Sequence, residues 1–268
     1  MKKIFLTIIF IILLLIISLI TIISTNGVET TKFNNIISQK IKETNNNVGV
    51  KLNTIKFKLD IKQISLFLET KNPTINYRGA SIPVKNIKVY IDFFSLVKSK
   101  IKINKINLAL NEIDINQLKK ISTNFKPSNY KSFINHKINQ GKINAEIEIY
   151  LENNNLLDNF IARGSVSDLT AELLDGVFIE KTNFTFFADK TDILIKKIFS
   201  NAGFFNIIDG DLKFKLDPEI SLESNFKTKL NFKGNQNNFK NLKKKLNFNH
   251  DLSDLDAELN NTLFLKFD

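Results

Sequence analysis

Residues 220–232 read ISLESNFKTKLNF, the longest stretch of the chain in which apolar and polar side chains alternate. Successive side chains of a β-strand point to opposite faces of the sheet. A period of two therefore predicts a strand with one apolar face and one wet face. The side chains on the apolar face are Ile220, Leu222, Ser224, Phe226, Thr228, Leu230 and Phe232.

The same alternation recurs earlier in the chain. It predicts further strands over residues 50–64, 87–91, 106–110, 143–151 and 212–216. Residue pairs and triplets typical of turns separate these segments. They are Asn72-Pro73, Asn153-Asn154-Asn155, Asp175-Gly176, Asp209-Gly210 and Asp217-Pro218.

Helical patterns are few within this region. Short helices are predicted near Phe93–Val97, Asn116–Ser122, Tyr130–His136 and Phe239–Leu246, too few for β-α-β units. The predicted fold class is mostly β, with two N-terminal helices followed by a long curved antiparallel sheet that forms an apolar groove. The chain has only 9 glycines, which supplies few sharp barrel corners. A closed sandwich remains an alternative, because alternation alone does not say what covers the apolar face.

The N-terminus predicts a membrane anchor. Lys2 and Lys3 precede the apolar run from Ile4 to Ile23, which at 1.5 Å per residue is about as long as the 30 Å hydrocarbon core of a bilayer. A signal-peptide core is shorter and ends in a small-x-small cleavage site, which this exit lacks. An uncleaved signal anchor in the bacterial inner membrane is therefore favoured, with the two lysines in the cytoplasm and the C-terminal body in the periplasm.

Three regions follow from this reading. Residues 1–25 hold the lysine pair and the anchor, residues 26–47 an amphipathic helix and linker, and residues 48–268 a periplasmic β-groove domain. The amphipathic helix is predicted over residues 29–45, because Phe33, Ile36, Ile37 and Ile41 recur at helical spacing. This helix either caps the open end of the domain that follows or lies against the membrane surface.

Composition excludes several classes of protein. The chain carries a formal charge of +11, but only Arg78 and Arg163 among its 38 basic residues are arginine. Nucleic-acid readers favour arginine for its planar, bidentate guanidinium, and here lysines alternate with Ile and Leu along strands, so no nucleic-acid partner is expected. The absence of cysteine excludes thiolate metal sites and cysteine nucleophiles.

Candidate catalytic or metal-binding residues are sparse. His136 and His250 lie far apart in the sequence and are interpreted as surface residues. Asp209 and Asp211 flank Gly210, but the other ligands of a calcium loop do not follow, so a hairpin turn is predicted there. The acidic residues between Asp251 and Glu258 are interpreted as a solvated helix or loop face. We therefore expect no enzyme activity, no metal and no cofactor.

The order of elements resembles the N-terminal region of AsmA-like proteins, which are anchored in the bacterial inner membrane. The resemblance lies in the strand at Val50–Ile64, the turn and strand of ETKNPTI at residues 69–75, ASIPVKNIKV at residues 80–89 and FSLVKSKIKINKINL at residues 94–108. The segment from Gly164 to Phe232 is similar to the repeated hairpins of that group. Because the chain ends inside a strand pattern at Phe264–Asp268, a truncated member is expected.

The resemblance implies a repeating β-groove that works in phospholipid transport between the inner and outer membranes. Membrane lipids would then be partners, together with further chain or a periplasmic or outer-membrane partner at the C-terminal edge. The alternative is a structural or adaptor domain that assists outer-membrane protein assembly without carrying lipid. The anchor is bounded by Ile4 and Ile23. The residues predicted to line the apolar groove are Ile55, Phe57, Leu59, Ile87, Val89, Ile147, Ile149, Phe214, Phe226, Leu230 and Phe232.

Overall fold

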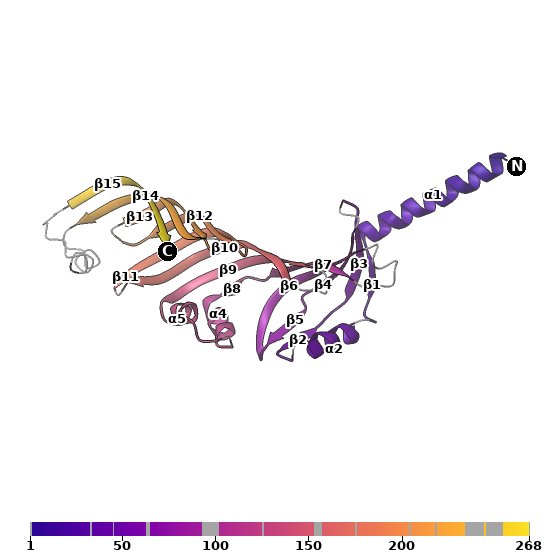
Figure 1. The fold of residues 1–268 in the computed structure, drawn as a ribbon, viewed down its shortest axis with the longest axis horizontal. Helices are drawn as coiled ribbons and strands as arrows, with labels where there is room; N and C mark the ends of the chain where they lie inside the picture. Colours follow the sequence, from indigo (N-terminus) through magenta and orange to yellow (C-terminus); the bar gives the residue numbers. More distant parts are fainter. Residues whose placement is uncertain are drawn as a thin grey trace. The chain divides into compact units, whose positions relative to one another are not determined.

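Most of the chain forms one large antiparallel sheet that is not closed, which confirms the predicted fold class. The structure is a computed structural model (Figure 1). It describes residues 2–32, 34–44, 46–62, 65–92, 102–124, 126–152, 157–174, 176–203, 205–217, 219–233, 244 and 254–267.

The first element is the long helix α1 (Lys2–Thr25), drawn in indigo in Figure 1. Its segment Ile4–Thr25 is long and apolar enough to cross a membrane, and most of that segment is exposed. The hydroxyls of Thr21 and Thr25 donate hydrogen bonds of 2.8 Å to the carbonyls of Ile17 and Thr21. These polar groups are thereby satisfied within the helix, as a hydrocarbon environment requires.

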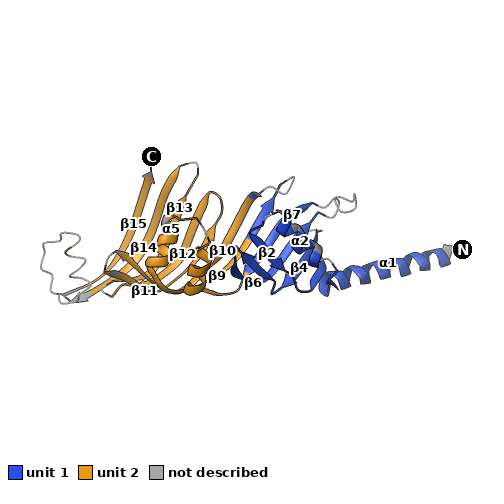
Figure 2. Cartoon of the chain, turned by 90° about the horizontal axis from the view of Figure 1, so that it is seen from below, with its two compact units in different colours: residues 1–109, 148–158 blue, residues 110–147, 159–268 orange. Residues whose placement is uncertain are grey.

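The chain divides into two compact units (Figure 2). Unit 1 comprises residues 1–109 and 148–158, and unit 2 comprises residues 110–147 and 159–268. The strand β9 (Ile138–Leu151) contributes residues to both units, because its last four residues belong to unit 1. Each unit is described separately below.

Among its described residues, unit 1 contains α1, the helix α2 (Asn34–Thr44) and the strands β1 to β7. In the sheet, β1 (Val28–Thr30), β3 (Ile55–Asp60), β4 (Ser65–Lys71), β6 (Ala80–Ile91) and β7 (Ile103–Leu110) are neighbours in that order. The strand β2 (Val48–Lys51) pairs with β5 (Thr74–Tyr77), and β5 in turn pairs with β6. The helix α2 packs against β2.

Two predictions for unit 1 were wrong in detail. The helix predicted over residues 29–45 begins only at Asn34, and Val28–Thr30 instead pairs with Ile55–Phe57 of β3, where Glu29 forms an ion pair with Lys56. The strand predicted over residues 50–64 is divided between β2 and β3. The amide of Asn53 explains the break, because it donates to the carbonyls of Lys71 and Asn72 at 3.2 and 2.8 Å and so fixes a non-strand connection.

Unit 2 begins with two short helices. A two-residue strand, β8 (Ile113–Asp114), pairs with β9 and leads into α4 (Ile115–Ser122), which is followed by α5 (Asn129–His136). Asp114 caps α4, because its carboxylate accepts from the Gln117 N–H at 2.8 Å while the Gln117 side chain accepts from the Asp114 N–H. These helices confirm two predictions. The helix predicted at Phe93–Val97 lies outside the described residues, as does the helix at Phe239–Leu246 except for Lys244.

Long strands make up the rest of unit 2. The strands β9, β10 (Leu157–Leu174), β11 (Val177–Ala188), β12 (Asp192–Asn201), β13 (Phe205–Lys215), β14 (Ile220–Lys233) and β15 (Asp254–Phe267) are neighbours in sequence order. The strand predicted over residues 220–232 is confirmed as β14. The longest strand among the described residues is nevertheless β10, with 18 residues against 14 in β14. The acidic residues Asp254, Asp256 and Glu258 lie in β15, and not on a helix or loop as predicted.

The predicted turn at Asp209-Gly210 was also wrong, because both residues lie within β13. Gly210 is buried and faces Phe226 across the β13–β14 ladder. A Cβ atom at residue 210 would lie 2.4 Å from Cδ1 of Phe226. The glycine is therefore present to admit an aromatic ring from the next strand, and not to turn the chain.

A line of β-bulges crosses unit 2. The register shifts between Val166 and Leu169 on β10, between Glu180 and Thr185 on β11, and between Ile207 and Asp209 on β13. Three residues along this line have φ near +50°, namely Asp168, Lys181 and Lys197. Bulges bend a strand and increase its twist, so adjacent strands of unit 2 bend at neighbouring positions.

The β11–β12 turn supports a prediction on pH dependence. The Asp189 carboxylate accepts hydrogen bonds of 2.8 Å from the N–H groups of Thr191 and Asp192, and these bonds lower the pKa of Asp189. After allowance for solvent screening, Asp189→Ala should reduce the free energy of unfolding by about 0.5–1 kcal/mol at pH 7. A lowered pKa means that this stabilisation is lost as pH falls through the folded-state pKa, so the deficit should shrink below about pH 4.

Urea unfolding of the full chain in detergent, at pH 7 and at pH 3, measures this difference. Asp217→Ala, at an exposed carboxylate between β13 and β14, serves as the control and should change the free energy of unfolding by less than about 0.5 kcal/mol. An Asp189→Ala deficit that is equally large at both pH values would contradict the assignment.

Candidate functional site

Unit 1 presents an apolar face made of cross-strand rows on β3, β4 and β6. Ile55, Phe57 and Leu59 of β3 pair with Thr70, Leu68 and Leu66 of β4. The same three residues of β4 pair with Ile87, Val89 and Ile91 of β6. Because paired residues share a face, the structure brings together five of the predicted groove residues, Ile55, Phe57, Leu59, Ile87 and Val89.

Part of this unit 1 face is a packed core. Ile55 is 2% exposed, and Ile91 is also buried. The other predicted residues of the face, including Phe57 and Val89, are half-buried, as is Ile149 on the part of β9 that belongs to unit 1. Ile55 therefore contributes to packing within unit 1, and the open apolar surface has to be sought elsewhere.

Unit 2 has a longer apolar face. Two cross-strand rows run through six adjacent strands, from β10 to β15, in continuous register. The first row consists of Ala162, Ala188, Ile193, Phe214, Leu222 and Leu265. The second row consists of Gly164, Phe186, Ile195, Leu212, Ser224 and Leu263.

Burial of this face differs between its two ends. Ala171, Ile179 and Ala202 form a buried cluster, against which Leu169 and Phe205 pack. On β14 and β15, by contrast, the exposed fraction is 51% for Ile220, 48% for Leu263 and 42% for Leu259. We call one face of β13, β14 and β15 the β13–β15 apolar face. Its residues are Phe205, Ile207, Gly210, Leu212 and Phe214 of β13, Ile220, Leu222, Ser224, Phe226, Thr228 and Leu230 of β14, and Ala257, Leu259, Asn261, Leu263 and Leu265 of β15. Its middle is more enclosed, because Ser224 and Thr228 are buried and Phe226 is half-buried, so its exposed apolar side chains lie on β15 and at Ile220.

Three of the predicted groove residues lie on the β13–β15 apolar face. Phe214 pairs with Leu222, Phe226 with Gly210, and Leu230 with Phe205. Ile147 is half-buried on β9. The backbone of Phe232 pairs with Leu255, and its side chain lies outside those described. In the anchor, Ile4 is exposed and Ile23 is half-buried.

Sequence reasoning missed the contribution of β15 to this face. Ala257, Leu259, Leu263 and Leu265 pair with residues of the β14 apolar face. These residues recur at a spacing of two, which is typical of a strand. The alternation is interrupted by the polar run Asn260-Asn261-Thr262 and preceded by acidic residues, so it is less evident than in β14. In the structure Asn261 lies on the same face as these residues, opposite Phe226.

Small polar side chains occupy positions within the apolar face of unit 2. The hydroxyls of Thr182 and Ser200 lie 2.6 Å apart, and both residues are buried. On the exposed side, the Asn261 amide donates to the Thr228 hydroxyl at 3.1 Å. These polar groups satisfy one another, so the face can remain apolar toward a ligand.

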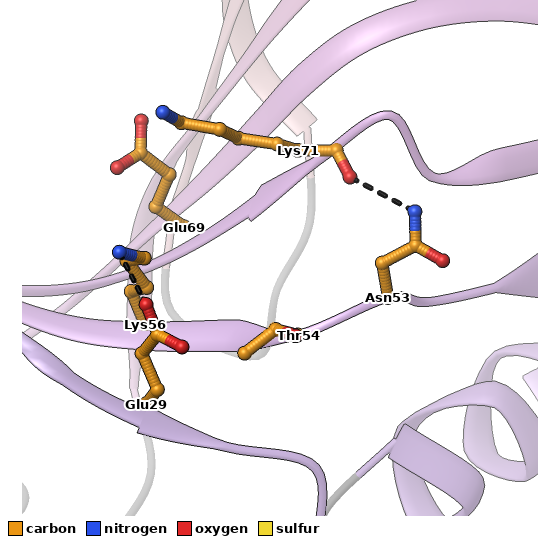
Figure 3. A pocket seen from close by; sticks show the side chains of 6 residues that line it. All are labelled: Glu29, Asn53, Thr54, Lys56, Glu69 and Lys71. Carbon is orange, nitrogen blue, oxygen red and sulfur yellow. Dashed lines mark hydrogen bonds and ion pairs between the residues drawn. The ribbon is translucent and has the colours of Figure 1, made fainter.

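Unit 1 also contains a charged cleft of about 210 Å³, shown in Figure 3. Glu29, Asn53, Thr54, Lys56, Glu69 and Lys71 line it. The Glu69 side chain is only 7% exposed and lies 3.0 Å from the ammonium of Lys58 and 3.9 Å from that of Lys88. Glu29 forms an ion pair with Lys56. Opposite charges neutralise one another here, as expected of ion pairs that join adjacent strands.

Lysines and aromatic rings are interleaved nearby in unit 1. The ammonium of Lys105 lies 4.5 Å from the ring centre of Tyr90 and 5.9 Å from that of Tyr150. Burial raises the pKa of Tyr90, and the nearby carboxylates of Asp60, Glu148 and Glu69 raise it further. Tyr90 therefore remains neutral at physiological pH, and its ring contributes to packing and to cation–π attraction.

The described residues contain no group of three or more His, Asp or Glu side chains that could hold a metal ion. His136 is exposed on α5, and Asp211 accepts a hydrogen bond from the Lys197 N–H at 3.1 Å. His250 lies outside the described residues. Exposed apolar side chains of the described residues occur instead on the β13–β15 apolar face.

The chain matches no family model and no curated protein.

Proposed function

We propose that this chain is a membrane-anchored protein that binds the acyl chains of phospholipids on the β13–β15 apolar face. The observation that carries the proposal is the exposure of that face in a sheet that is not closed. Ile220, Leu259, Leu263 and Leu265 are each at least 40% exposed on neighbouring strands. Contiguous apolar patches of this kind mark binding sites in soluble domains.

The physical advantage of such a face is large for a lipid in transit. An acyl chain that crosses water exposes apolar surface at a cost of about 0.8 kcal/mol per CH₂ group. A row of leucines and phenylalanines on adjacent strands can cover one side of the chain, while the headgroup stays in water. This binding requires neither a nucleotide nor a metal, and we propose no enzyme activity.

The setting of this activity is proposed from the N-terminus. Lys2 and Lys3 precede the apolar run of α1, and no second candidate span occurs among the described residues, which favours a single-pass inner-membrane protein with its body in the periplasm. Together with the resemblance to AsmA-like proteins, this supports a role in phospholipid transport between the inner and outer membranes. The packed core of unit 1 supports the second candidate, an adaptor domain whose apolar faces serve folding alone.

Photolabelling distinguishes these two functions. The full chain is incorporated into vesicles containing a phospholipid with a diazirine in its acyl chain, irradiated, digested and analysed by mass spectrometry. Labels are expected on peptides from β13–β15 as well as on α1. In Leu263→Asp the β13–β15 labels should fall at least tenfold, because a carboxylate in the acyl-chain path would have to be desolvated.

Two controls make the result specific. Labelling of α1 should be unchanged and serves as an internal control. Thr262→Asp, at an exposed position on the opposite face of the same strand, should keep its β13–β15 labels. Circular dichroism checks that both variants fold, which is expected because Leu263 is 48% exposed. Absence of β13–β15 labels in the unmodified chain, or full labelling of Leu263→Asp, would refute lipid binding at this face.

A further inference from the structure

The strand β15 has a neighbour on one side only. Its 14 residues pair with β14 without a register shift, from Asp254 opposite Lys233 to Phe267 opposite Ile220. No strand pairs with its other edge in the described part of the chain, and β15 lies at the end of unit 2 (Figure 2). A long edge of this kind presents free backbone N–H and C=O groups to any strand that can pair with it.

This edge also lacks three of the features that normally prevent pairing. Proteins protect free edges with prolines, bulges or inward-pointing charges. Residues 254–267 contain no proline, and the ladder contains no bulge. The positions of β15 on the β13–β15 apolar face carry no charged residue, and Leu259, Leu263 and Leu265 among them are each at least 40% exposed.

The side chains of β15 complement themselves when two copies run antiparallel. Centring the pairing on Asn261 places Leu259 opposite Leu263 and Ala257 opposite Leu265. On the other face it places Asp256 opposite Lys266, once on each side of the centre. Parallel pairing in register would instead place each Asp256 beside its copy, which is repulsive.

The register follows from the same residues. A shift of one residue would bring the apolar face of one strand against the polar face of the other. A shift that moves the centre to Asn260 or Thr262 would set Asn261 opposite a leucine. Only centring on Asn261 matches leucine with leucine and asparagine with asparagine.

We propose that β15 is a homodimerisation strand that pairs antiparallel with β15 of a second copy, centred on Asn261. The two-fold axis is perpendicular to the sheet, so the β13–β15 apolar faces of both copies lie on the same side. In this dimer Leu259 of each copy packs beside Leu263 of the other, which reduces the exposure of both side chains. This proposal is independent of lipid binding, and each can fail without the other.

Cysteine cross-linking tests the pairing directly, because the natural chain has no cysteine. In the proposed dimer the two Asn261 Cα atoms are about 4.5–5.5 Å apart, which is within the range for a disulfide. The full-length Asn261→Cys chain, purified in detergent and mildly oxidised, should run mainly as a covalent dimer that reductant dissociates. Thr262→Cys is the matched control, because its two Cα atoms would lie roughly 8 Å apart and should not cross-link.

A mixed experiment tests the register. Leu259→Cys and Leu263→Cys chains with different tags should form the mixed disulfide when combined, and little disulfide when each is oxidised alone. Equal cross-linking at positions 261 and 262 would contradict the proposal, because it would mean that the chains meet at random and do not pair in one register. Folded Asn261→Cys that stays monomeric, including the case in which another strand occupies the edge, would overturn the proposal.

Discussion

Gly164→Ala is expected to destabilise unit 2 by about 3 kcal/mol or more, which is a large fraction of the stability of a typical domain. A Cβ atom at residue 164 would lie 2.0 Å from the carbonyl oxygen of Asn144 and 3.0 Å from Cα of Ala145 on β9. It would also lie 2.8 Å from Cζ of Phe186 on β11. Because two of these atoms belong to the backbone, the clash cannot be relieved by a change of rotamer.

Chemical unfolding of the full chain in detergent, followed by far-UV circular dichroism, measures this effect. Gly49→Ala is the matched control, since Gly49 also lies in a strand, β2, and its new Cβ would meet only Cβ of Asn76 at 3.9 Å. This control should be neutral or slightly stabilising, because glycine is unfavourable within strands. A Gly164→Ala chain as stable as Gly49→Ala would contradict the close approach of β9 to β10.

Gly210→Ala is expected to destabilise the chain by about 2 kcal/mol, and Phe226→Ala should remove most of that penalty. The new Cβ would lie 2.4 and 2.7 Å from two ring carbons of Phe226, and the ring must leave its place to admit it. Once the ring is absent, alanine at residue 210 should be neutral or gain about 0.5 kcal/mol, since it restricts the unfolded chain more than glycine does.

A double-mutant cycle measures this coupling between residues 210 and 226. We expect an interaction free energy of about 1.5–2 kcal/mol, well above the value of about 0.5 kcal/mol within which distant pairs are additive. Gly210→Ala combined with Phe214→Ala is the control cycle, because Phe214 pairs with Leu222, two rows away from Phe226. Additivity in both cycles would mean that the Phe226 ring does not lie over Gly210.

Much of the architecture could be predicted from local patterns. The apolar run from Ile4 to Ile23 predicted α1, and strict alternation predicted β14 and the apolar side of β9 and β13. Helical spacing predicted α4 and α5. These features depend on residues within one turn or one strand of each other, so the sequence contains all that is needed to infer them.

The inferences that were wrong depend on partners far away in the sequence. Asp209-Gly210 has the composition of a turn, but Phe226 on the next strand needs the space that a side chain at residue 210 would fill. The acidic residues between Asp251 and Glu258 have the composition of a solvated helix or loop, but Asp254–Glu258 pair with β14 as part of β15. In unit 1, residues 50–64 divide because the Asn53 side chain donates to the carbonyls of Lys71, at the end of β4, and of Asn72.

The sequence by itself therefore determined that this protein is a β-sheet with an apolar face, preceded by a helix able to span a membrane. Only the tertiary structure decided which apolar residues are core and which are surface. Ile55 and Leu263 occupy equivalent positions in their alternation patterns, yet Ile55 is 2% exposed and Leu263 is 48% exposed. The physical reason is that alternation specifies the face on which a side chain lies, while its burial depends on whether another segment packs over that face.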